Sequence, residues 1–380
     1  MLSIRLLKFC AADSRGAQMQ GSDTPFGPQT DMNTCTIERT NVRRYQDKKT
    51  NRSVRLGPIR AEPDRRLTAS RDELEDVLAE IFDHAFSPVR HGRARVNGIR
   101  MHYVTAGQGE PLLLLHGTPK TNYYWAKLFP LLTPHFTVVA PDLRGFGYTD
   151  KPPAEEGYDS LTNAKDMAEL MTFLGHERFH VHGEDRGAEF AYALAATQRE
   201  RVKTLSFCEM LLSGEGLEEW SNFTTDNISA QYRQKGVWVW HIPFFWIPHL
   251  PEMLITGRER AFWEFWIKAE TWNPNAITDE AINEWIARLT APGGLRGCLE
   301  TYRAGLHNAR INKELKQNKL TLPIMTVGAP EFFGPLVEDQ MRKVSTGVQR
   351  AEIFQECGHS LAWEAEERLA NMLREFMLGR

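Results

Sequence analysis

A carboxylate stands where a nucleophile is expected near the middle of this 380-residue chain. Residues 182–188 read HGEDRGA, so that glycines flank Asp185 in the pattern Gly-x-nucleophile-x-Gly, between a predicted strand (179–182) and a predicted helix (186–197). Small neighbours allow the sharp turn that projects the central side chain at the carboxyl edge of a sheet. The chain holds no Gly-x-Ser-x-Gly. Because a carboxylate can displace a leaving group at an sp³ carbon, we expect Asp185 to form an alkyl ester.

Hydrolysis of such an ester needs a base, and His359 follows the last predicted strand (351–354) in the sequence Cys-Gly-His-Ser. In chain order nucleophile, acid, histidine, this position predicts the base that activates water. Two acids could orient its imidazole: Glu209 follows the strand predicted at 204–207, and Glu331 follows the strand predicted at 323–327. Spacing alone leaves both open.

An oxyanion hole is expected beside the nucleophile. Residues 115–119 read LHGTP at the end of a predicted strand (111–115). We expect the backbone N–H groups of Thr118 and Arg186 to stabilise the tetrahedral oxyanion that forms when water attacks the ester of Asp185.

The elements around these residues predict an α/β fold with a doubly wound, mostly parallel sheet. Asn97-Gly98 lies between β-type runs at 95–103, which is typical of a hairpin. Short, continuous apolar runs separated by helical patterns are typical of parallel strands buried on both faces. Besides the strands already given, 136–140 is a predicted strand and 163–174 a predicted helix.

The chain divides into four predicted parts. Residues 1–68 are polar and read as a disordered tail, and 69–92 as a lead-in helix, with Ser70 and Glu73 as a capping box, and a linker. The core is expected at 93–210 and 304–380, with a helical cap inserted at 211–303. Eight of the ten tryptophans fall in this cap, which suits a roof over an apolar pocket or an aromatic core of its own.

Composition points to a small-molecule enzyme. A net charge of −3 gives no general attraction to nucleic acid, and the lack of an apolar run of about 18 to 20 residues argues against membrane insertion. Five scattered cysteines suggest neither disulfides nor a zinc site, so we expect a cytoplasmic protein that needs no metal and no cofactor. The oligomeric state is left open.

Together with the Asp185 and Gly358-His359 motifs, His116–Pro119 and the segment 142–147 (DLRGFG) resemble the epoxide hydrolase and haloalkanoic acid dehalogenase branch of the α/β-hydrolases. The resemblance covers residue 93 to the C-terminus. It implies an α/β-hydrolase fold.

Within that branch, the segments 239–241 (VWH), 254–260 (LITGRER) and 300–304 (ETYRA) look most like Cif-type epoxide hydrolases. This likeness implies that His241 and Tyr302 protonate the oxygen of an apolar epoxide and that the product is a vicinal diol. It also favours Glu209 over Glu331 as the orienting acid.

The rival reading is a fluoroacetate-type dehalogenase acting on a halogenated substrate, because that family holds the substrate carboxylate with an arginine at the position of Arg186. Glu189 stands where a second arginine is expected and would repel an anion, and Ile242 replaces an expected tryptophan. Haloalkane dehalogenases would have tryptophan at 186. A ligand-binding protein without activity is the third reading, and retained catalytic residues argue against it.

Overall fold

The computed structural model describes residues 45–46, 53–54, 79–226 and 239–379. The chain forms two units, 1–67 and 68–380. In the first unit the described residues form two short antiparallel strands, β1 (Tyr45–Gln46) and β2 (Ser53–Val54). The rest of the predicted tail and the predicted capping box at Ser70 lie outside the described residues.

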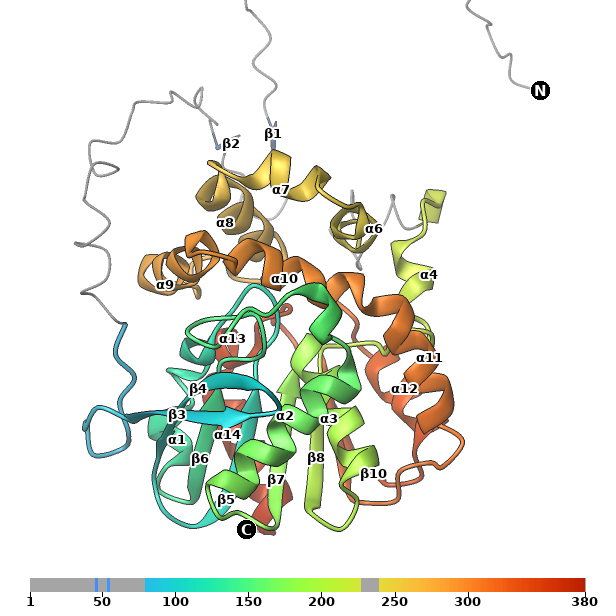
Figure 1. The fold of residues 1–380 in the computed structure, drawn as a ribbon. Coiled ribbons are helices and arrows are strands. Elements are labelled where there is room, and N and C mark those ends of the chain that lie inside the picture. Colours follow the sequence, from blue (N-terminus) through green and yellow to red (C-terminus); the bar gives the residue numbers. More distant parts are fainter. Residues whose placement is uncertain (1–44, 47–52, 55–78, 227–238, 380) are drawn as a thin grey trace, which may run out of the picture. The chain divides into compact units, whose positions relative to one another are not determined.

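The second unit is built on one eight-stranded sheet with the order β10-β9-β8-β7-β5-β6-β4-β3 (Figure 1). The contacts of β4 with β3 and β6 are antiparallel and the others are parallel, which confirms the predicted mostly parallel sheet. The strands are β3 (Arg90–Val96), β4 (Ile99–Ala106), β5 (Glu110–Leu115), β6 (Phe136–Pro141), β7 (Phe179–Glu184), β8 (Val202–Cys208), β9 (Ile324–Gly328) and β10 (Val348–Ile353).

The hairpin that opens the sheet turns at the predicted Asn-Gly pair. Asn97 and Gly98 have φ angles of 40° and 84°, and Val96 pairs with Ile99 across the turn. A two-residue hairpin of this type needs positive φ at both central positions, which asparagine and glycine tolerate best.

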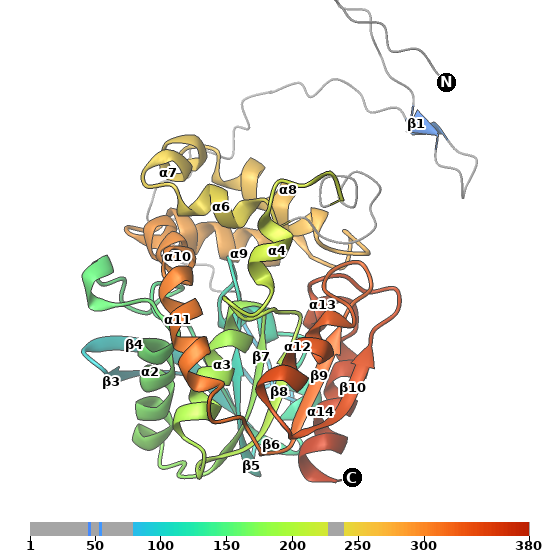
Figure 2. The same cartoon turned by 90° about the vertical axis from the view of Figure 1, so that its right-hand side faces the viewer.

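Helices cover both faces of the sheet: α2 and α3 lie on one face and α1 and α14 on the other (Figures 1 and 2). Asp159 caps α2 by accepting from the backbone N–H groups of Leu161 and Thr162. The helices outside the β8–β9 segment are η2 (Asn122–Trp125), α1 (Phe129–Leu132), η3 (Ala154–Glu156), α2 (Ser160–Phe173), α3 (Arg186–Thr197), α12 (Leu336–Val344), α13 (Leu361–Glu364) and α14 (Glu366–Leu378).

Between β8 and β9 the described residues form helices and no strand. The helices α6 to α8 lie beyond one end of the sheet, and α9 and α10 lie between them and the strands (Figures 1 and 2). These elements are α4 (Leu217–Ser221), α6 (His241–Trp246), α7 (Leu250–Ile255), α8 (Glu259–Ala269), α9 (Asp279–Thr290), α10 (Gly294–Arg303) and α11 (Gly305–Leu315). None of the described helices is both long and apolar enough to cross a membrane.

Candidate active site

Asp185 occupies a tight turn between β7 and α3. Its backbone has φ 57° and ψ −136°, a conformation that most side chains avoid and that tends to occur at functional sites. The flanking glycines are required by close backbone approach: a Cβ on Gly187 would lie 2.0 Å from the carbonyl oxygen of Leu115, and one on Gly183 would lie 2.4 Å from that of Gly187. The turn therefore holds the Asp185 side chain at the carboxyl edge of the sheet.

Two backbone amides hold the Asp185 carboxylate. Thr118 N–H donates to Oδ2 over 3.1 Å, and Arg186 N–H donates to Oδ1 over 2.6 Å. In this resting state the two amides expected to form the oxyanion hole thus bind different oxygens. A Cβ on Gly117 would lie 2.3 Å from the Cβ of Asp185, so glycine there lets the turn approach the nucleophile.

The imidazole of His359 lies between two carboxylates. Its Nε2 is 3.2 Å from Oδ2 of Asp185, and its Nδ1 is 3.4 Å from Oε2 of Glu209. Glu209 is buried and also accepts a hydrogen bond of 2.5 Å from the backbone N–H of Ala329. No contact joins Glu331 to His359 among the described residues. Of the two candidate acids, Glu209 is therefore the one brought to the histidine.

The pair of Asp185 and His359 is charged before substrate arrives. Burial disfavours the ionised carboxylate, but the hydrogen bond and charge of His359 outweigh it and lower the pKa of Asp185 to about 2. Burial also disfavours the imidazolium, yet Asp185 and Glu209 raise the pKa of His359 to about 10. Conversion of Asp185 to a neutral ester would remove one of these anions and lower the pKa of His359, which then becomes a base.

His241 from α6 and Tyr302 from α10 meet in the wall of the same cavity. Their ring centroids are 5.6 Å apart in an edge-to-face arrangement, and both side chains are buried. Burial lowers the pKa of His241 to about 3 and raises that of Tyr302 well above its ordinary value. Both groups are therefore neutral at physiological pH, and the Tyr302 hydroxyl keeps its proton.

The remaining cavity wall is mostly apolar. Of the described tryptophans in the predicted cap, Trp266 reaches this wall, whereas Trp263 and Trp285 are fully buried in packing. Trp272, in contrast, is exposed, so the tryptophans of this segment do not share one role. The apolar residues of the wall are Met210, Leu217, Val239, Ile242, Trp266, Phe332 and Phe333.

Glu270 is a wall residue that the motifs did not reveal. Its carboxylate is 3.9 Å from Nδ1 of His241, and its carbonyl oxygen accepts the backbone N–H of His359 over 2.8 Å. Burial raises the pKa of Glu270 to about 8. A signal was present in the sequence, because Glu270 follows Trp263, Trp266 and Ile267 at helical spacing on the buried side of α8.

Two further charged side chains are buried close to the nucleophile. Glu184 accepts hydrogen bonds from the Tyr124 hydroxyl and from the backbone N–H of Leu361. Burial raises the pKa of Glu184 to about 7, against the opposing charge of Lys120. The Lys120 ammonium lies 4.3 Å above the ring of Tyr124. Glu184 lies inside the 182–188 motif and Lys120 directly follows the 115–119 motif, but the sequence pattern does not show that both side chains turn inward.

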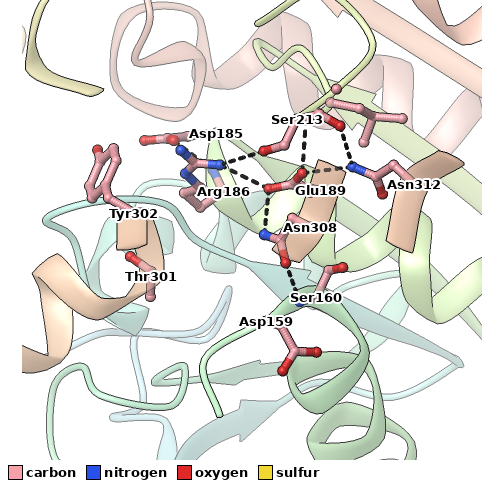
Figure 3. A network of polar contacts seen from close by, with 12 residues as sticks. Asp159, Ser160, Asp185, Arg186, Glu189, Ser213, Thr301, Tyr302, Asn308 and Asn312 are labelled. Atoms are coloured by element: carbon pink, nitrogen blue, oxygen red, sulfur yellow. Dashed lines mark hydrogen bonds and ion pairs between the residues drawn. The ribbon is translucent and has the colours of Figure 1, made fainter. Parts of the chain in front are cut away.

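Glu189 does not face the cavity, which corrects the expectation that it repels an anionic substrate directly. It is fully buried beside Arg186, and its Oε2 is 2.9 Å from Nη1 of that residue (Figure 3). Arg186 itself is in the cavity wall. Within the described part of the chain, no cluster of three or more His, Cys, Asp or Glu side chains could hold a metal ion.

Known proteins with this architecture carry related activities. The family model described as alpha/beta hydrolase fold matches residues 110–234. A soluble epoxide hydrolase from Corynebacterium sp. (strain C12) is 31% identical over 291 residues, which are 76% of this chain and 97% of that protein. A fluoroacetate dehalogenase from Burkholderia sp. is 31% identical over 216 residues, 55% of this chain and 67% of that protein.

A solved structure extends the likeness to nearly the whole described second unit. Wild-type Cfl2 from Burkholderia cenocepacia has a TM-score of 0.71 at 32% identity, covering 79% of this chain and 100% of that chain. The chain therefore belongs to the α/β-hydrolase fold family, in the branch that contains epoxide hydrolases and fluoroacetate dehalogenases, and it is an enzyme of that branch.

Proposed function

We propose that this enzyme hydrolyses small, largely apolar epoxides to vicinal diols through a covalent ester on Asp185. One observation carries the proposal: a nucleophilic carboxylate paired with His359 and a neutral His241–Tyr302 pair line the same cavity. An epoxide needs both, because its carbon is attacked while its oxygen leaves as an alkoxide that must receive a proton.

In the first step, a carboxylate oxygen of Asp185 forms a bond to an epoxide carbon, and the electron pair of the broken C–O bond goes to the oxygen. The Tyr302 hydroxyl, assisted by His241, hydrogen-bonds to this oxygen and supplies its proton. A neutral tyrosine suits this role, since an alkoxide is more basic than a phenolate.

Formation of the ester leaves Tyr302 as a phenolate and lowers the pKa of the His359 imidazolium, so the proton of His359 returns to the phenolate through solvent. In the second step, water attacks the carbonyl carbon of the ester and gives its proton to the now neutral His359, which Glu209 orients. The amides of Thr118 and Arg186 stabilise the oxyanion of the tetrahedral intermediate. Collapse of the intermediate releases the diol and restores the Asp185 carboxylate.

We assign residues 211–303 the role of a cap over this site and expect the reaction to take place in the cytoplasm.

Similarity to a soluble epoxide hydrolase over 97% of that protein supports this assignment. The second candidate is a fluoroacetate-type dehalogenase, which is favoured by the Arg186 guanidinium in the cavity wall and by the shorter match to a fluoroacetate dehalogenase. Both reactions pass through an ester on Asp185, and they differ in the alkyl group that the ester carries.

The mass of the trapped ester separates the two. We would incubate the His359→Gln variant with a panel of epoxides and a panel of haloacids and measure its intact mass, with Asp185→Asn as the control. An adduct of one whole epoxide, absent from the control, is the expected result. An adduct equal to a haloacid minus its hydrogen halide would make the enzyme a dehalogenase, and no adduct from either panel would contradict the ester mechanism.

A further inference from the structure

Arg186 and the protonated His359 are cationic side chains of the cavity wall. The buried carboxylate of Glu189 accepts a hydrogen bond from the Arg186 guanidinium. Nη1 of Arg186 donates to Oε2 of Glu189 over 2.9 Å and to the Ser213 hydroxyl over 3.4 Å. The guanidinium also lies against the ring of Tyr302, with its carbon 4.8 Å from the ring centroid. Figure 3 shows Arg186 between Tyr302 on one side and Glu189 on the other.

Glu189 is held as an ionised carboxylate. Three groups besides Arg186 donate to it: the backbone N–H of Ser213 over 3.0 Å, Nδ2 of Asn308 over 3.1 Å and Nδ2 of Asn312 over 2.9 Å. All of these partners are donors, and a carboxylate that only accepts is in its charged form. The side chain is completely buried, so solvent does not screen this charge.

The donors are themselves fixed in place. Oδ1 of Asn308 accepts the backbone N–H of Ser160 over 2.8 Å, and Nδ2 of Asn312 also donates to the carbonyl oxygen of Ser213 over 2.9 Å. These contacts come from α2, α11 and the segment after β8, whose residues surround Glu189 in Figure 3. Because Ser213, Asn308 and Asn312 all hydrogen-bond to its carboxylate, Glu189 cannot turn away from Arg186 without breaking these bonds.

This arrangement sets the charge that a substrate meets. The Asp185 anion is already paired with the His359 cation, so a substrate carboxylate would bind beside it only where a further positive charge in the wall is left unbalanced. The positive charge of Arg186 is balanced by Glu189 at 2.9 Å. We infer that Glu189 is a specificity-determining positioning residue, which fixes and neutralises Arg186 so that the cavity accepts uncharged epoxides and rejects those that carry a carboxylate.

The test compares two epoxides of nearly the same shape, oxirane-2-carboxylate and oxirane-2-carboxamide, in the wild type and in the Glu189→Gln variant. We measure the ratio of their kcat/KM values in each variant. This ratio does not depend on how much of the enzyme is folded. The two epoxides differ in intrinsic reactivity, but that difference is the same for every variant and cancels when the ratios are compared. Asn312→Ala is the matched control, since it removes a hydrogen bond to the same carboxylate but leaves the charge.

The wild type should prefer the carboxamide, and Glu189→Gln should shift the ratio toward the carboxylate by about tenfold or more, mainly through a lower KM for the carboxylate, because one unit of nearby negative charge is lost. Asn312→Ala should leave the ratio within about twofold, since no charge changes. An unchanged ratio in Glu189→Gln, or an equal shift in Asn312→Ala, would overturn the inference.

The inference rests on the proposed function, and a binding measurement keeps the two apart. If the wild type opens neither these two epoxides nor any apolar epoxide of the panel, the proposed function fails. The charge preference is then measured from the affinities for propanoate and propanamide, which need no turnover. Glu189→Gln should still gain affinity for propanoate relative to propanamide, and no gain would reject the role of Glu189.

Discussion

Nε2 of His359 lies 3.2 Å from Oδ2 of Asp185, so the base and the nucleophile form an ion pair before substrate reacts. The nucleophile is thereby kept ionised and the histidine is kept from acting as a base too early. Loss of the Asp185 charge on ester formation is the event that turns the imidazolium into a base.

Substitution of Asp185 by Asn should therefore lower the pKa of His359. In the wild type, Asp185 and Glu209 raise it to about 10 against the effect of burial, so the ring is charged at neutral pH. With one anion removed, burial and the loss of attraction both favour the neutral ring, and the pKa falls. Nitrogen NMR chemical shifts of the histidine rings measure this, with the exposed His135 as the internal control. A neutral His359 in the wild type at neutral pH would contradict the ion pair.

Glu209 and Glu331 should differ sharply when each is changed to Gln. Glu209→Gln removes the carboxylate that orients His359, so hydrolysis of the ester should slow by roughly a hundredfold or more and the ester should accumulate. Glu331→Gln should turn over like the wild type. Rapid-quench mass spectrometry of the ester decides the matter, and equal defects in both variants would mean that the acid has been misassigned.

Tyr302→Phe and His241→Gln should slow formation of the ester and leave its hydrolysis nearly unchanged. The reason is that their proton is needed when the epoxide oxygen leaves, and general acid catalysis contributes roughly 10²- to 10⁴-fold. Single-turnover mass measurements separate the two steps. Tyr192→Phe is the matched control, because Tyr192 is a fully buried tyrosine on α3 outside the cavity wall. A defect in ester hydrolysis instead would place the pair in the second step.

Glu270 should produce an alkaline limb in the pH profile of kcat/KM. Burial raises the pKa of Glu270 to about 8, so below this pH the carboxyl group is neutral, and above it a second negative charge enters the wall beside Asp185. That charge disfavours further build-up of anionic oxygen in the cavity, and activity should fall as pH rises through about 8. Glu270→Gln should remove this limb and keep activity at neutral pH. A limb that persists in the variant would assign it to another group.

Much of the fold could be predicted from sequence because the central parallel strands, such as β5 and β6, are short apolar runs next to turn signals. The predicted run at 179–182 continues to Glu184 in β7, since the polar residues Gly183 and Glu184 still pair with β8. The apolar pattern alone cannot show this, because hydrogen bonding to neighbouring strands and not hydropathy decides where a strand ends.

The site was predictable where its residues sit inside local motifs, as with Asp185, Thr118 and His359. The ambiguity between Glu209 and Glu331 could not be resolved by spacing, because both follow strands at the same edge of the sheet. Glu189 was misread for a related reason: its partners Asn308 and Asn312 lie more than a hundred residues away, and no local pattern links them.

The carboxylate of Glu189 also has a consequence for how this chain can evolve. It binds Ser213, where the chain leaves the core after β8, and Asn308 and Asn312, where the chain returns on α11. The residues that flank the stretch 214–307 are thus both hydrogen-bonded to the Glu189 side chain. The free energy of closing such a loop changes only slowly with its length. Insertions and deletions between these points would change the helices that follow β8 while the nucleophile helix α3 keeps its position, so substrate range could change without loss of the Asp185 geometry.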